Sequence, residues 1–351
     1  MKMIFMMKSL ARPVAGLLAT AALVLAGCGG GAAGSAGEGA EPGQLSIVTA
    51  FYPFQFVAER VAGPRADVQS LTQPGAEPHD VELTPRLVGS VSTADLVVYE
   101  RSFQPAVDEA VDQAEAREVL DTATVVPLEP LDAAGHADEE EHAPAHEHAD
   151  GEHADEGHAD GEHADGGHAD AHAEDEHGGL DPHVWLDPTK LATIAGAVAD
   201  RLSALDEEHA AEYAANAATL QRELGKLDEE FRTGLARCER SDFITTHTAF
   251  GYLARRYGLS QIGITGLSPD AEPSPARIAE VQQEARAHGV TTIFYETLIS
   301  PAIAESIADD LGLATDVLDP IEGITEQSRG RDYLAVMRSN LAALQKANGC
   351  A

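Results

Sequence analysis

Cysteine is scarce in this chain. The 351 residues include three cysteines, at Cys28, Cys238 and Cys350. None of them belongs to a Cys-x-x-Cys pair, the spacing typical of dithiol redox centres and of thiolate zinc sites. The sequence therefore gives no support to a thiol redox function or to a thiolate metal centre.

Positive charge is scarce as well. Lysine and arginine number 23 against 59 aspartates and glutamates, and the formal net charge is -36. Contact with nucleic-acid phosphates requires a basic surface, and none is visible here. We therefore expect cations rather than nucleic acid as partners, for a chain long enough to bury the cores of two domains.

The N-terminus carries a short apolar stretch at 14–26, preceded by basic residues. The stretch is too short to span a bilayer comfortably and is typical of an export signal. It ends in Leu-Ala-Gly-Cys28, which resembles a bacterial lipobox, the motif whose cysteine becomes the lipidated first residue of the mature protein. We predict a signal peptide at 1–27, a lipid anchor on Cys28 at the outer face of the bacterial cell membrane, and a flexible tether at 28–43.

Histidine is concentrated in one run that contains no lysine or arginine, and in which His-Ala-Asp recurs every five residues. That period matches neither a helix nor a strand, so we predict a disordered His/Asp/Glu-rich loop at 135–178. Its imidazoles offer weak, exchangeable sites for zinc, copper or nickel, and a solvated acidic linker is the alternative. These auxiliary residues are His136, His142, His146, His148, His153, His158, His163, His168, His172 and His177.

On both sides of this run, β-rich segments alternate with helical patterns. Such alternation predicts βαβ units with parallel sheets covered by helices. The expected strands are 45–49, 66–71, 95–99, 243–246, 261–265, 291–295 and 314–318. We also expect a helix that starts at about residue 188, just after Asp187, and ends at about residue 204.

Between the two series, residues 206–235 carry apolar side chains at spacings of mostly three and four, which predicts one amphipathic helix about 45 Å long that starts at Asp206. The predicted fold class is α/β: two βα lobes, each with a mostly parallel sheet, joined by one long rigid helix. We place the N-terminal lobe at 44–204, the connecting helix at 205–237 and the C-terminal lobe at 238–351.

The two cysteines outside the lipobox, Cys238 and Cys350, face an oxidising compartment in an exported protein, where leftover thiols usually pair. We predict a structural disulfide between them. It would tie the C-terminus to the start of the second lobe.

Five histidines remain outside the run. His79, His183 and His247 lie in polar or turn-rich segments at the ends of predicted elements, where open α/β sheets place ligands. His209 and His288 lie at the start and the end of predicted helices, and we expect structural roles for them. A loop histidine is more often a surface residue than a ligand, so position alone leaves both interpretations open.

Three segments carry a resemblance that bears on this choice: Pro-Gly-Ala-Glu-Pro-His79, Asp-Pro-His183-Val-Trp-Leu-Asp-Pro and Thr-His247-Thr-Ala-Phe-Gly-Tyr-Leu. They resemble the metal-binding receptors of ABC uptake systems, the cluster A-I family, and particularly its zinc-specific branch. In that family, two βα lobes joined by a long helix hold the metal between them. The resemblance implies that His79, His183 and His247 are ligands. It also implies zinc, because the manganese branch typically has a carboxylate at the position of His247 and a His-rich insertion is typical of zinc receptors.

The family's fourth ligand varies between an acidic residue in a late loop and a water. Glu322 fits the acid position best. Glu296, at the end of a predicted strand, is the competitor and could instead be an outer hydrogen-bonding or capping group, and Glu77 or a water completes the alternatives. Three neutral imidazoles with one carboxylate or water form a set suited to the zinc ion.

The resemblance implies a monomeric receptor, not an enzyme, that captures zinc outside the cytoplasm and delivers it to an ABC permease. A surface zinc buffer or adhesin is one alternative. A zinc hydrolase is another, but it would need an open coordination position with a general base nearby, and the sequence has no His-Glu-x-x-His motif.

Overall fold

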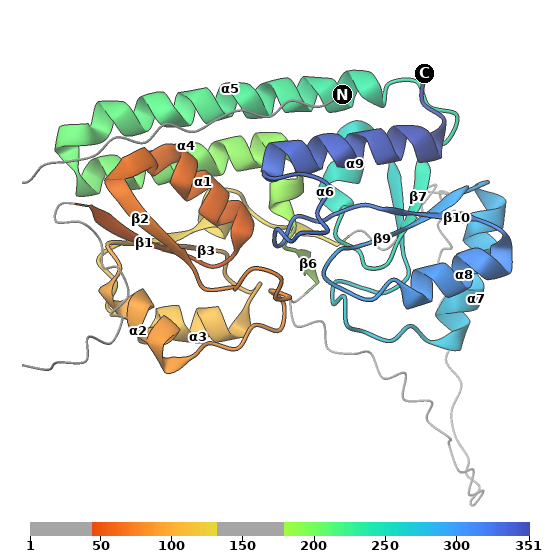
Figure 1. The fold of residues 1–351 in the computed structure, drawn as a ribbon, viewed down its shortest axis with the longest axis horizontal. Coiled ribbons are helices and arrows are strands. Elements are labelled where there is room, and N and C mark those ends of the chain that lie inside the picture. The colour runs from red at the N-terminus through yellow and green to blue at the C-terminus, as the bar shows by residue number, and fades with distance from the viewer. Residues whose placement is uncertain (1–43, 132–178) are drawn as a thin grey trace, which may run out of the picture. The chain divides into compact units, whose positions relative to one another are not determined.

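The structure is a computed structural model that describes residues 44–131 and 179–351. The predicted signal peptide, the tether, the lipidation site Cys28 and the His-rich loop with its ten histidines lie outside the described residues. The described residues form two lobes, each built on a four-stranded parallel sheet (Figure 1). This confirms the predicted fold class. Within 44–131 and 179–351, no helix is both long and apolar enough to cross a membrane.

The first sheet has the strand order β2-β1-β3-β4, and each neighbouring pair is parallel. Strand β3 is buried along its whole length, as expected for a parallel sheet with helices on both faces. Helix α1 covers one face, and α2 and α3 cover the other (Figure 1). The elements are β1 (Leu45–Thr49), α1 (Tyr52–Ala62), η1 (Gly63–Arg65), β2 (Ala66–Ser70), α2 (Pro85–Thr93), β3 (Leu96–Tyr99), α3 (Pro105–Gln113), β4 (Val119–Asp121) and η2 (Thr122–Thr124).

The second sheet has the order β10-β9-β7-β8 and is also parallel throughout. Helices α6 and α9 pack against one face of this sheet, and α7 and α8 pack against the other. The elements are β7 (Asp242–Thr245), α6 (Gly251–Tyr257), β8 (Ser260–Gly263), α7 (Pro275–Ala287), β9 (Thr292–Tyr295), α8 (Ala302–Leu311), β10 (Ala314–Val317) and α9 (Tyr333–Asn348).

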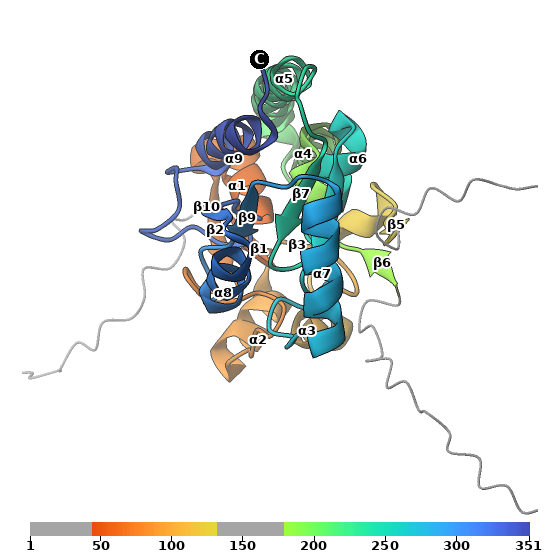
Figure 2. The ribbon, with the colours of Figure 1, turned by 90° about the vertical axis from the view of Figure 1, so that its right-hand side faces the viewer.

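A helical hairpin joins the lobes, formed by η3 (Val184–Leu186), α4 (Pro188–Leu205), η4 (Glu207–His209) and α5 (Ala210–Gly234). Helix α5 lies over α4 and α9 in both views (Figure 1, Figure 2), and it also contacts α1. It therefore spans both lobes, as predicted. Its start differs from the prediction, because Asp206 opens the short η4 turn rather than α5. The Asp206 carboxylate accepts a hydrogen bond from Tyr213 Oη at 2.8 Å and so closes the corner between the two long helices.

The apolar core is continuous across the lobes. One large cluster contains buried side chains from the first lobe, from α4, α5 and α9, and from one face of the second sheet. A smaller cluster lies on the other face, under α7 and α8. Neighbouring residues of β7 show the division, because Phe243 belongs to the large cluster and Ile244 to the small one. Successive strand residues point to opposite faces of a sheet, so a single strand serves both cores.

Two further links involve residues near breaks or ends of the described chain. An antiparallel pair, β5 (Glu129–Pro130) with β6 (Leu180–Asp181), flanks the His-rich segment, and Leu131 N donates to Gly179 O at 2.9 Å. The structure also contains the predicted disulfide between Cys238 and Cys350. It joins the segment before β7 to the end of α9.

Candidate metal centre

Four side chains from separate parts of the chain converge between the lobes: His79, His183, His247 and Glu322, each able to offer one ligand atom. These four atoms lie within 4.8 Å of one another, and all four residues are buried. His79 comes from the loop between β2 and α2, and His183 from the segment before η3. His247 follows β7, and Glu322 lies in the loop between β10 and α9.

The same ring atom of each imidazole faces the Glu322 carboxylate. The distances to Glu322 Oε1 are 3.4 Å from His79 Nε2, 3.3 Å from His183 Nε2 and 3.6 Å from His247 Nε2. The Nε2 atoms of His183 and His247 are 3.4 Å apart. Three nitrogens and one oxygen therefore surround one small volume, which is the composition of a four-ligand zinc site.

Two of the histidines are oriented through their other ring nitrogen. His183 Nδ1 lies 2.9 Å from Asp181 Oδ1, and His247 Nδ1 lies 2.6 Å from Glu296 Oε1. A carboxylate that accepts the Nδ1 proton fixes the tautomer in which the Nε2 lone pair is free to bind a metal. Sequence reasoning missed this role of Asp181. Its position two residues before His183, in Asp-Pro-His, was the available signal.

The competitors for the fourth position lie outside the four-atom cluster. Glu296 lies behind His247 and also accepts a hydrogen bond from the Thr246 hydroxyl. Glu77 accepts a hydrogen bond from the main-chain N–H of His79 at 3.2 Å. Burial, and then the neighbouring Glu322 carboxylate, raise the pKa of Glu77 to about 9. Glu77 is therefore a neutral acid beside the cluster at neutral pH.

The electrostatics of the cluster favour a bound cation. Burial raises the pKa of Glu322, but hydrogen bonds from His183, His247 and His79 outweigh it and hold that pKa well below its ordinary value. Glu322 is thus an anion in a site closed to solvent, and its Oε2 atom has no hydrogen-bond partner among the described residues. Buried polar atoms nearly always have partners, so this carboxylate fits a cation placed between it and the imidazoles.

The pKa values of the three histidines shift in different directions. Burial lowers the pKa of His79, and the opposing effect of the Glu322 carboxylate is too small to offset it. Burial also acts to lower the pKa of His183 and His247, but the carboxylates that face them outweigh it and raise both values. Proton binding at these two residues therefore competes with metal binding.

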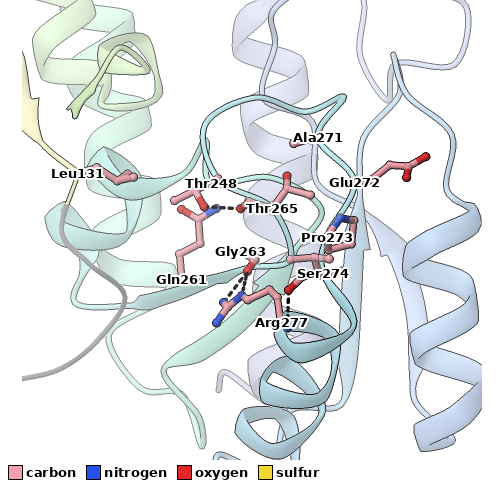
Figure 3. Close-up of a pocket in the computed structure, with 12 residues that line it drawn as sticks. Leu131, Thr248, Gln261, Gly263, Thr265, Ala271, Glu272, Pro273, Ser274 and Arg277 are labelled. Carbon is pink, nitrogen blue, oxygen red and sulfur yellow. Dashed lines mark hydrogen bonds between the residues drawn. The ribbon is translucent and has the colours of Figure 1, made fainter. Parts of the chain in front are cut away.

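A cavity of about 350 Å³ opens elsewhere on the second lobe (Figure 3). Its lining comes mainly from β8, the segment after it and the first turn of α7, with Thr248 and Leu131 at its edge. None of the four converging residues lines it. The Arg277 guanidinium fills part of its wall and donates to Gly263 O at 2.6 and 3.2 Å. The metal cluster therefore lies apart from this cavity.

The two histidines expected to be structural lie outside the cluster. His209 Nδ1 is 2.7 Å from Asp206 Oδ2 in the corner between α4 and α5. His288 caps the end of α7, and its Nδ1 atom lies 3.3 Å from Asp242 Oδ1.

Two parallel-sheet lobes, a helix that spans them and a buried donor cluster between them define a bilobal solute-binding protein. The sequence match gives the particular family. The chain belongs to the family described as zinc-uptake complex component A, periplasmic (ZnuA), whose model matches residues 47–347.

Individual relatives agree with this assignment. The high-affinity zinc uptake system protein ZnuA of Bacillus subtilis is 34% identical over 339 residues, which cover 94% of this chain and 95% of that protein. The zinc-binding lipoprotein AdcA of Streptococcus pneumoniae is 33% identical over 87% of this chain, which spans 56% of AdcA. The crystal structure of the Zn(II)-bound ZnuA-like domain of that AdcA matches with a TM-score of 0.66 at 31% identity, covering 87% of this chain and 99% of that domain.

Proposed function

We propose that this protein captures zinc outside the cytoplasm and delivers it to the ABC permease of a zinc uptake system. The observation that carries the proposal is the buried cluster of three imidazoles and one carboxylate between the lobes. The names of the relatives support zinc as the cargo and uptake as the process, since the Bacillus subtilis relative is named for a high-affinity zinc uptake system.

In this proposal, His79, His183, His247 and Glu322 bind the zinc ion. The set is borderline in softness, which suits zinc better than manganese, an ion that prefers more oxygen ligands. Asp181 and Glu296 would hold the two imidazoles in the metal-binding tautomer, from the positions described above. Glu77 would lie outside the coordination shell.

The completeness of the donor set favours a receptor over a zinc hydrolase. Catalytic zinc typically has three protein ligands and one position open to water or substrate. Here the fourth donor is a buried carboxylate, so no position is left for an activated water. A surface buffer or adhesin would not need donors that converge from two lobes.

The location and anchoring of the protein belong to the same proposal. A signal peptide at 1–27, a lipid on Cys28 and a tether at 28–43 would keep a monomeric receptor beside the permease. The relative AdcA is named a lipoprotein, which supports the anchor. The domain limits given above for the lobes and the connecting helix are proposed on the same basis.

Zinc titration of the full-length protein, in competition with a chelator at neutral pH, tests the proposal. We expect one tight site, which Glu322→Gln weakens. A second test is growth of bacteria that lack their own zinc receptor but express this chain with its cognate permease, in zinc-limited medium. Growth that depends on His247 supports uptake, whereas tight binding without rescue would favour the buffer.

A further inference from the structure

The single tryptophan links the two halves of the donor cluster. Trp185 lies two residues after His183, is fully buried, and donates a hydrogen bond from its indole Nε1 to Pro320 O at 2.7 Å. Pro320 lies two residues before Glu322. One hydrogen bond therefore connects the segment that carries a histidine donor with the loop that carries the carboxylate donor, across 135 residues of sequence.

The indole is held firmly from its own side. Its ring packs edge-on against Phe51, with centroids 4.7 Å apart, and lies 5.5 Å from the ring of Phe103. The hydroxyl of Tyr333 donates to the main-chain oxygen of Trp185 at 2.6 Å. These contacts fix the direction of the indole N–H, so it can act as a rigid reference for the loop that it contacts.

The loop that it contacts has an unfavourable backbone conformation. Ile321, directly before Glu322, has a φ of 62°. A β-branched residue rarely adopts this left-handed conformation, and it persists where the surroundings over-determine it. The neighbouring side chain of Asp319 accepts a hydrogen bond from Ile321 N at 2.8 Å.

A second anchor holds the same loop from α9. The buried amide of Asn340 makes two hydrogen bonds with the main chain of Asp319: its Oδ1 accepts from Asp319 N at 3.0 Å, and its Nδ2 donates to Asp319 O at 2.7 Å. The residues at 319, 320 and 321 are thus each tied down immediately before the carboxylate donor.

We propose that Trp185 is a positioning residue of the zinc site, which holds the Glu322 loop in its strained conformation so that the carboxylate is in place before the metal arrives. This inference rests on the proposed function. Loss of the anchor lets the backbone at Ile321 relax and turns Glu322 away from the imidazoles. Donors held in place beforehand bind more tightly because less ordering is required on binding.

The test is Trp185→Phe in the full-length protein, which keeps an aromatic ring but removes the N–H donor. We expect zinc affinity to fall about 10–100-fold, as for other groups that orient metal ligands. Tyr213→Phe is the matched control, because it removes one hydrogen bond from an equally buried ring at the corner between α4 and α5. Its affinity should equal that of the wild type.

A double-mutant cycle separates positioning from a general structural effect. Once Glu322→Gln has removed the charged donor, Trp185→Phe should weaken zinc binding little further, because both changes act through the same carboxylate. The absorption spectrum of bound cobalt should also change in Trp185→Phe towards that of Glu322→Gln. Asn340→Ala, which removes both hydrogen bonds to the main chain of Asp319, tests the anchoring of the same loop should Trp185→Phe not fold.

The outcomes distinguish this inference from the function on which it rests. Wild-type affinity in Trp185→Phe, or in Asn340→Ala where Trp185→Phe does not fold, would overturn the positioning role and leave the zinc site intact. Effects that simply add to that of Glu322→Gln would overturn it as well. If Glu322→Gln itself binds zinc as the wild type does, the proposed site is wrong instead.

Discussion

The two lobes support their donors over different distances along the chain. In the N-terminal lobe, the supporting groups are local. Asp181 stands two residues before His183. Its carboxylate accepts a hydrogen bond from the main-chain N–H of His183 and faces the ring Nδ1 of the same residue. Glu77 stands two residues before His79 and accepts its main-chain N–H. A short segment therefore contains both the donor and the group that orients it.

In the C-terminal lobe, the supporting groups come from elsewhere in the fold. Glu296 reaches His247 across 49 residues. The loop of Glu322 depends on Asn340 in α9 and on Trp185 in the other lobe. These donors are in place only when the whole tertiary structure has formed, so this half of the site is more sensitive to changes at a distance.

Replacement of a donor should reduce zinc affinity the most, and by a similar factor for donors from either lobe. His79→Ala, His183→Ala and His247→Ala should each weaken zinc binding more than about a hundredfold, since loss of outer groups alone costs about 10–100-fold. Chelator competition measures this, with His153→Ala in the redundant run as the control. If all three variants retained wild-type affinity, the ligand assignment would be wrong.

Acidification should come next in effect. The pKa values of His183 and His247 are raised, and a protonated imidazole has no lone pair, so the zinc ion must displace its proton. Affinity should therefore fall as the pH falls, starting above the ordinary value of 6.5 and approaching about a hundredfold per pH unit for two protons. Titrations across this range check the slope. A constant affinity would contradict binding by these imidazoles.

The orienting carboxylates allow the two lobes to be compared directly. Asp181→Asn and Glu296→Gln should each weaken binding about 10–100-fold. Each carboxylate accepts from the main-chain N–H and faces the Nδ1 of its own histidine, but Glu296 also accepts from the Thr246 hydroxyl. The loss should therefore be larger for Glu296. The measurement is the zinc affinity of the two variants side by side. A greater loss in Asp181→Asn would contradict the idea that donors supported by residues distant in sequence are the more sensitive to substitution.

Deletion of 135–178 should have the smallest effect on the tight site. The four proposed ligands lie outside this run, and the hydrogen bond between Leu131 and Gly179 brings its flanks together without it. Calorimetry should show that weak zinc sites disappear while one tight site keeps its affinity. Loss of the tight site would instead make the His-rich run the receptor.

The same local and distant contrast explains what the sequence could predict. The seven predicted strands are present, with ends that differ by at most two residues, because each is a short apolar run with its own boundaries. The short elements α2, α3 and β4 and the pair β5–β6 were not predicted. Their apolar patterns are brief, and the antiparallel pair joins residues on either side of a long insertion.

The site divides along the same line. The motifs around His79 and His183 include their supporting groups within a few residues, so the signal for Asp181 was present in the sequence although its role was missed. The choice between Glu322 and Glu296 remained open, because both follow strands of the second sheet and only the fold separates a residue inside the cluster from one behind His247. The positive φ of Ile321 and the bond from Trp185 have no local signal.

The continuous core has a consequence for how the molecule can open. Sliding the lobes apart as rigid bodies would expose side chains that α4, α5 and α9 share with both sheets, and such exposure is costly. The large core should therefore unfold as one cooperative unit. The small cluster under α7 and α8 is separate from this core and contains fewer buried side chains, so hydrogen exchange should be faster there than in the large core.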